Sequence, residues 1–265
     1  MRLVKAQGFG NDFLLVDAAD VPAGADLVAL ARFVCERRRG IGADGLILFE
    51  TRAPWASMRL LNADGSPSEV SGNGVRCLAA WIATTRDLRP GAVVEVATDA
   101  GPKRLELLAR AGIEFTFCAS MGQPERVERH ALPVCGTTVD AITLRVGNPQ
   151  CVVLGPVTSH RLHTIAAGLS SHPHFPEGAN VELAAVEAPD RVRILIWERG
   201  VGPTESSGTG ACAAAVAAIE FGGASRDLQV TSPGGTQRVE WRADGLYLTG
   251  TASVIAEIAW KGRLT

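Results

Sequence analysis

The feature that most constrains the fold is a Ser-Gly-x-Gly turn that occurs twice and leads each time into an Ala-rich segment. SGNGVRCLAAW begins at Ser71 and SGTGACAAAV begins at Ser207, so the copies lie 136 positions apart (71 to 207) in a chain of 265 residues. A lone Gly-rich turn before a helix is a weak signal. A matched pair separated by half the chain predicts an internal duplication.

Other segments recur in the same order at nearly the same offset. GNDFLLVD at Gly10 matches GNPQCVVL at Gly147, GADGLILF at Gly42 matches GANVELAA at Gly178, and MRLLNADG at Met58 matches ILIWERGV at Ile194. A period this long excludes a solenoid, whose repeats span about 20–50 residues. We therefore predict two related domains, residues 1–134 and 135–265. Whether the last strand, ASVIAEIAW, crosses back to the first half stays open.

Both halves show the same pattern of expected elements. Short apolar runs bounded by Gly, Asn and Asp predict strands, and residues 25–39, 75–85, 159–169 and 211–222 predict helices. The strand runs that follow the Ala-rich helices are joined by short turns, which favours antiparallel pairing. The Ala-rich helices are apolar on most faces, which favours burial inside a sheet. We predict an α+β fold of two pseudo-symmetric domains, each a curved, mostly antiparallel sheet or barrel around a central helix.

Composition narrows the class of protein. A hydrophobic fraction of 46%, a charged fraction of 20% and a net charge of −2 are typical of a globular protein and disfavour nucleic-acid or membrane partners. No apolar run approaches the roughly 20 residues of a membrane helix. Six cysteines without CxxC spacing favour reduced thiols in the cytoplasm. The oligomeric state stays open, with a homodimer as one alternative.

The two Gly-rich turns also suggest a binding site. A helix N-terminus presents unpaired backbone N–H groups and about half a positive charge, so it binds anions such as a carboxylate. Two such termini facing each other would hold one carboxylate from both sides. We also predict that Ser71 and Ser207 cap their helices, because Ser is among the best capping residues; capping without any binding role is the alternative.

Eight motifs together resemble a known family. GFGNDFLLVD, RRGIGADGL, NADGS, SGNGVRC, GNPQCV, FPEGANVE, WERGVGPT and SSGTGACAAA resemble the successive motifs of the diaminopimelate epimerase family, in that family's order and over nearly the whole chain. The resemblance implies two similar domains with the active site between them. It also implies a reaction without pyridoxal phosphate or metal that inverts one Cα of diaminopimelate, from the LL to the meso form, in lysine and cell-wall precursor synthesis. In the family, one cysteine thiolate removes the Cα proton and a second thiol delivers one to the opposite face.

The resemblance also assigns binding roles. It implies that the substrate, an amino acid with two carboxylates, is contacted by Asn11, Asn62, Asn148, Asn180, Glu198 and Arg199, and by a backbone cradle at Gly72, Asn73, Gly208 and Thr209. Arg199 is suited to a bidentate grip on the distal carboxylate. A single such Asn is more often a turn residue, but four of them aligned with two Gly-rich turns are better explained by a ligand.

Three positions depart from the family, and all three concern catalysis. Ser71 and Ser207 stand where the family has its two cysteines, and Gln150 stands where it has a histidine. A serine hydroxyl needs a neighbouring base to become a useful proton acceptor. Glu198 is the preferred candidate base. The serines are either native to a branch of the family or introduced in place of cysteines, and Gln150 favours the first.

Two weaker candidates for the base are Asp44 and Asp64, which lie in the same motifs. The leading hypothesis is a cofactor-independent amino-acid epimerase that turns over diaminopimelate slowly or not at all, because both thiols are replaced. A second is an isomerase or dehydratase of a different acid that uses a carboxylate base such as Glu198. A third is a non-catalytic binder of a dicarboxylic amino acid.

Overall fold

The chain divides into two compact units. The computed structural model describes residues 1–52, 55–68, 71–99 and 101–262, and it is a mixed α/β structure with strand-rich sheets and few helices. The first unit comprises Met1–Ala119 and Gly250–Thr265, and the second comprises Ser120–Thr249. This division differs from the predicted boundary at 134/135. The reason is that strand β9 (Glu125–Val134) pairs along its length with β10 (Thr137–Val146) and therefore stays in the second unit.

The first unit is built mainly from the N-terminal part of the chain. Its elements are β1 (Arg2–Gly8), β2 (Asn11–Asp17), η1 (Ala18–Asp20), α1 (Leu27–Cys35), β3 (Gly45–Arg52), β4 (Trp55–Asn62), β5 (Pro67–Ser68), α2 (Gly72–Thr85), β6 (Val93–Thr98), β7 (Gly101–Ala111) and most of β8 (Glu114–Gly122). Pairing runs in the order β1–β2–β3–β4–β6–β7–β8. The C-terminal part of β17 (Gly245–Ala259) pairs with both β8 and β1, so these strands form a closed ring.

The second unit repeats this order of pairing. Its elements are β9, β10, β11 (Asn148–Leu154), α3 (Ser159–Arg161), η2 (Leu162–Ala166), α4 (Ala167–Ser170), β12 (Asn180–Ala188), β13 (Arg191–Glu198), β14 (Gly202–Thr204), α5 (Gly208–Gly222), β15 (Asp227–Ser232), β16 (Gly235–Arg242) and the start of β17. β11–β12 and β13–β15 are parallel, as are β2–β3 and β4–β6 in the first unit. The remaining pairs with a defined register are antiparallel.

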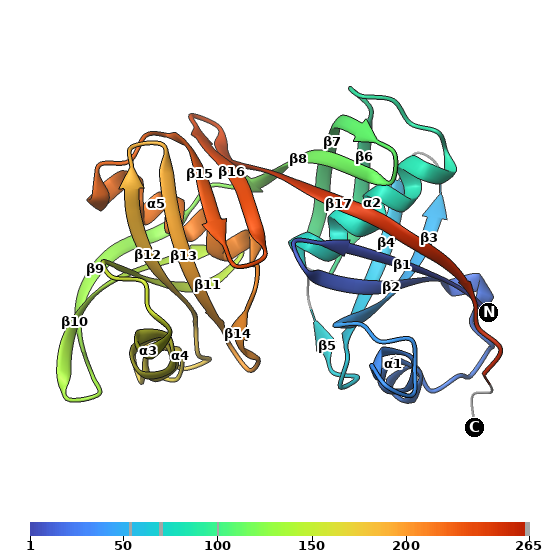
Figure 1. Ribbon diagram of the computed structural model, residues 1–265, viewed down its shortest axis with the longest axis horizontal. Coiled ribbons are helices and arrows are strands. Elements are labelled where there is room, and N and C mark those ends of the chain that lie inside the picture. The colour runs from blue at the N-terminus through green and yellow to red at the C-terminus, as the bar shows by residue number, and fades with distance from the viewer. Residues whose placement is uncertain (53–54, 69–70, 100, 263–265) are drawn as a thin grey trace. The chain divides into compact units, whose positions relative to one another are not determined.

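One helix lies in the core of each unit: α2 in the first and α5 in the second (Figure 1). Eight successive residues of α5, Ala211–Ala218, are fully buried. Alanine has the highest helix propensity, and a helix without a polar face is stable only when it is surrounded. Within the described residues, no helix is long and apolar enough to cross a membrane.

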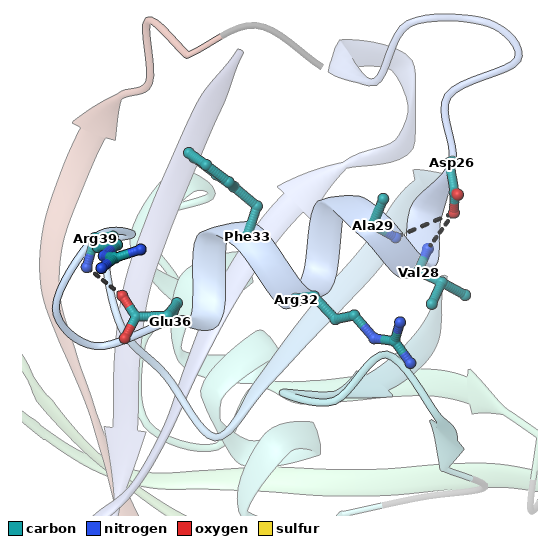
Figure 2. A pocket seen from close by; sticks show the side chains of 7 residues that line it. All are labelled: Asp26, Val28, Ala29, Arg32, Phe33, Glu36 and Arg39. Atoms are coloured by element: carbon teal, nitrogen blue, oxygen red, sulfur yellow. Dashed lines mark hydrogen bonds between the residues drawn. The ribbon is translucent and has the colours of Figure 1, made fainter. Parts of the chain in front are cut away.

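Helix α1 is shorter than the predicted helix over 25–39. Asp26 caps its start by accepting hydrogen bonds from the N–H groups of Val28 and Ala29 (Figure 2). Its end is set by Glu36, whose carboxylate accepts hydrogen bonds from three backbone N–H groups that follow it. The basic residues after Glu36 therefore form a turn instead of a last helical turn.

Candidate functional site

The two serines occupy equivalent places at the starts of α2 and α5. Ser71 Oγ accepts a hydrogen bond of 3.1 Å from the N–H of Gly74, and Ser207 Oγ accepts one of 3.1 Å from the N–H of Gly210. Both serines have extended backbone angles, as N-caps do. The prediction that both serines cap their helices is confirmed. The other N–H groups of each first turn retain the dipole that favours an anion.

In the first unit, the start of α2 is tied to the hairpin between β1 and β2. Asn73 is only 2% exposed, and its Nδ2 donates a hydrogen bond of 3.4 Å to Asn11 Oδ1. The buried guanidinium of Arg76 donates to Asn73 Oδ1 and lies 5.5 Å from the centre of the Phe9 ring. Sequence reasoning missed Arg76, although an arginine in an otherwise Ala-rich helix is the signal that could have indicated it.

Charged side chains orient the Asn11 amide. Asn11 Nδ2 donates a hydrogen bond of 2.7 Å to Asp44 Oδ2, and Arg37 bridges Asp44 and Asp12 at 2.7 and 2.8 Å. Lys5 also forms an ion pair with Asp12. Burial raises the pKa of Asp12, but hydrogen bonds from Arg37 and Lys5 outweigh it and leave that pKa below its usual value. Asp44, a predicted alternative base, is thus occupied as an acceptor for Asn11 and Arg37.

Asn62 and Asp64 form a separate hydrogen-bonded turn with Ser66. Asn62 Nδ2 donates to Ser66 Oγ at 3.0 Å, and the Asp64 carboxylate accepts from the Ser66 hydroxyl and N–H at 2.6 and 2.8 Å. These bonds from Ser66 lower the pKa of Asp64. A weakened base that caps a turn is a poor candidate for proton abstraction.

In the second unit, three polar side chains share the face that packs on α5. Val152, Ala184 and Ile196 belong to the core around α5. Side chains alternate along a strand, so the residue two positions away points to the same face. Those residues are Gln150 on β11, Glu182 on β12 and Glu198 on β13, and strand register places all three toward one end of the sheet.

Hydrogen bonds hold the predicted residues of this end in pairs. Gln150 Nε2 donates to Asn148 Oδ1 at 2.5 Å, and Thr204 Oγ1 donates to Glu198 Oε1 at 3.1 Å. At the start of α5, the Ser207 hydroxyl lies 3.4 Å from the hydroxyl of Thr209.

The Arg199 side chain is exposed, and hydrogen bonds from its backbone and its guanidinium fix its position. Its backbone N–H donates to Asn180 Oδ1 at 2.9 Å, and its Nη1 donates to the carbonyl of Glu177 at 2.8 Å. Gly178 has a positive φ of 73°, and its missing side chain leaves room for Arg199, whose Cδ would lie 3.0 Å from a Cβ there. The backbone around Asn180 and Gly178 therefore positions the guanidinium.

Glu182 is the most unusual residue of this end, and sequence reasoning missed it. Its side chain is fully buried, and within the described part of the chain neither carboxyl oxygen has a hydrogen-bond partner. Burial, and then the charge of Glu198, raise the pKa of Glu182 well above its usual value. The available signal was an acidic residue inside the apolar predicted strand of GANVELAA.

Neither a metal centre nor the surface pocket of the described residues coincides with the predicted substrate site. No group of three or more His, Cys, Asp or Glu side chains in the described ranges is arranged to hold a metal ion. A shallow surface depression lies along α1, and it is lined by Asp26, Val28, Ala29, Arg32, Phe33, Glu36 and Arg39 (Figure 2). It contains none of the residues predicted to bind substrate.

Comparison with known proteins points to one family of enzymes. The profile of the diaminopimelate epimerase family matches residues 3–127 and 142–255. A diaminopimelate epimerase of Desulforudis audaxviator is 39% identical over 98% of this chain and 99% of its own length. One of Moorella thermoacetica is 39% identical over 95% and 96%. Among solved structures, a probable proline racemase from Agrobacterium radiobacter is 17% identical, covers 98% of this chain and 92% of its own, and has a TM-score of 0.72, which shows a common fold.

Proposed function

Because this chain belongs to the diaminopimelate epimerase family, we propose that it is an amino-acid epimerase that needs no pyridoxal phosphate and acts on a Cα of diaminopimelate. The observation that carries the proposal is the match over nearly the whole chain. We also propose that the two units are pseudo-symmetric domains produced by duplication, each a curved sheet around a central helix. The repeated order of parallel and antiparallel pairs supports this.

We propose that Ser71 and Ser207 act on opposite faces of the substrate's Cα. The backbone N–H groups of residues 72, 73, 208 and 209 would hold the α-carboxylate. Their place at two serine-capped helix N-termini supports this role. Arg199 would bind the distal carboxylate, since its guanidinium is exposed and is held by a hydrogen bond to the Glu177 carbonyl.

The remaining predicted substrate contacts are the four asparagines. Asn11, Asn62, Asn148 and Asn180 each begin or end a strand, where an amide can reach a ligand. A cytoplasmic location is part of the proposal and is supported by six cysteines that are all free thiols.

Proton transfer is the step in which this chain should be weak. In the described part of the chain, the hydrogen-bond partners of the two serine hydroxyls are backbone N–H groups and the Thr209 hydroxyl, none of which is a base. General-base catalysis is efficient when the base has a pKa near the working pH, and a serine does not meet that condition. We therefore expect slow inversion of diaminopimelate.

The experiment measures incorporation of solvent deuterium at Cα from LL- and meso-diaminopimelate. Replacing both serines, Ser71→Cys with Ser207→Cys, should raise exchange by about 10²–10⁴-fold, because each thiol supplies a titratable group. One replacement alone should give exchange on one face with little inversion. Ser225→Cys, which adds a thiol at an exposed position beyond α5, is the matched control. Inversion by the unmodified chain at about 1–10³ per second would refute the reasoning.

Binding is tested separately by calorimetry. Arg199→Ala should weaken diaminopimelate by about 1.5–3 kcal/mol, the scale of a charge-assisted hydrogen bond. Arg191→Ala, at another exposed arginine of the same hairpin, is the control and should leave affinity unchanged. Tight binding without any exchange would favour a non-catalytic binder. Exchange with a different acid that depends on Glu198 would favour the isomerase or dehydratase alternative.

A further inference from the structure

The two units differ at one equivalent place beside the helix start. The third residue of each helix is a glycine, Gly74 in α2 and Gly210 in α5. Neither position therefore carries a side chain of its own. A Cβ on Gly74 would lie 3.1 Å from Ile47 Cδ1. A Cβ on Gly210 would lie 3.1 Å from the carboxyl carbon of Glu182, with Oε1 closer still. The first unit therefore fills this space with a methyl group, and the second fills it with a carboxyl group.

The fold does not require a carboxyl group there. Ile47 is fully buried, so the equivalent place accepts an apolar side chain. Burying a carboxyl group without a hydrogen-bond partner costs up to several kcal/mol. The first unit has no polar group at this place, although the second unit keeps a costly one. The buried carboxyl group of Glu182 is therefore best explained by a role in chemistry.

Glu182 lies next to the second serine. The Ser207 Cβ is 3.2 Å from the Cβ position of Gly210, the same point that the Glu182 carboxyl group approaches. The position that a Gly210 side chain would occupy therefore lies between the two side chains. The Ser207 hydroxyl also accepts a hydrogen bond from the Gly210 N–H, so the serine and the Glu182 carboxyl group both approach the same residue at the start of α5.

We propose that Glu182 exchanges protons with the substrate through Ser207, a role that rests on the proposed function. In one direction the Cα–H bond breaks, its electron pair stays on Cα, and the proton passes to Ser207 Oγ. In the same step the hydroxyl proton of Ser207 passes to the Glu182 carboxylate, so a new carboxyl O–H bond forms. The reverse step returns a proton to Cα. Glu182 does not touch the substrate and is a positioning residue that gives one serine the base it lacks.

The electrostatic surroundings set the pH dependence. The elements packed against β12 carry these titratable groups: Arg191, Arg193 and Glu198 on β13, Cys151 on β11, Cys212 and Glu220 on α5, and His163 on η2. Glu198 disfavours the ionised form of Glu182, as burial does. Exchange through Ser207 needs ionised Glu182 as the base, so its rate should rise with pH up to the raised pKa of Glu182.

The test compares Glu182→Gln with the parent protein in the deuterium-exchange assay. Glutamine keeps the shape but has no titratable proton, so exchange from the stereoisomer whose Cα hydrogen faces Ser207 should fall by about 10²-fold or more, and its rise with pH should disappear. KM should stay unchanged. In a Ser207→Cys background the loss should be less than tenfold, because the thiol titrates by itself. Glu187→Gln, at an exposed glutamate of the same strand, is the control.

Two measurements separate failure of this inference from failure of the proposed function. If diaminopimelate does not bind to the parent by calorimetry, the proposed function fails. If it binds but the parent shows no exchange, the proposed epimerase activity fails. If the parent exchanges and Glu182→Gln exchanges equally fast, only the role of Glu182 is overturned.

Discussion

The contact between Gly210 and Glu182 makes a sharp prediction for the substitution Gly210→Ala. In a helix, alanine is favoured over glycine by up to about 1 kcal/mol. Here, however, the new methyl group would meet the Glu182 carboxyl carbon at 3.1 Å and Ser207 Cβ at 3.2 Å. Glu182 is fully buried and cannot swing into solvent. Overpacking of this kind costs about 1–3 kcal/mol, so we expect a net loss of about 0.5–2 kcal/mol in the free energy of unfolding.

The matched substitution is Gly74→Ala in the first unit. There the nearest atom is the terminal methyl group of Ile47 at 3.1 Å, and the next is Ser71 Cβ at 3.3 Å. A terminal methyl group can shift by a few tenths of an ångström, so gain and cost should nearly cancel. Gly210→Ala should therefore be less stable than Gly74→Ala by about 1 kcal/mol or more.

Urea denaturation of both variants, and of each combined with Glu182→Ala, provides the assay. Removing the carboxyl group should abolish the penalty of Gly210→Ala, which gives a coupling energy of about 1–2 kcal/mol. Glu182→Ala should leave the effect of Gly74→Ala unchanged. If Gly210→Ala is as stable as the parent and shows no coupling to Glu182, the packing of the carboxyl group against the helix start is refuted.

Two further predictions concern buried acids. Glu182→Gln should gain stability relative to the parent as pH rises above about 4.3, by at most about 1.4 kcal/mol per pH unit. The reason is that the parent's folded state holds a proton on Glu182 that its unfolded state releases. Denaturant titrations from about pH 5 to about pH 8 that show equal stability of the two proteins would contradict this. For Asp12→Asn, the loss of the charged partner of Lys5 and Arg37 should cost about 1–3 kcal/mol near neutral pH, and the difference should shrink as pH falls below about 4, since the pKa of Asp12 is lowered in the folded state. Urea denaturation of both proteins near neutral pH and below about pH 4 measures this difference in stability. A difference that does not change with pH would show that the carboxylate charge is not involved.

Several features could be predicted from the sequence because they depend on local or repeated patterns. The paired Ser-Gly-x-Gly turns predicted two capped helices, and Ser71 and Ser207 do cap α2 and α5. Capping is decided by a few neighbouring residues, so a short motif is enough to indicate it. Family membership was likewise predictable, because eight ordered motifs span nearly the whole chain and the family profile matches the same regions.

Other features depend on which strands lie side by side. The boundary between the units fell earlier than predicted because β9 pairs with β10, a long-range choice that periodicity does not reveal. The end of α1 was set by the Glu36 turn. The roles of Arg76 and Glu182 emerged only from packing: whether a charged residue in an apolar segment is exposed or buried depends on what surrounds it. Sequence alone thus determined the caps and the family. The tertiary structure decided which polar side chains are enclosed beside the two helix starts, because burial is a property of neighbours that are distant along the chain.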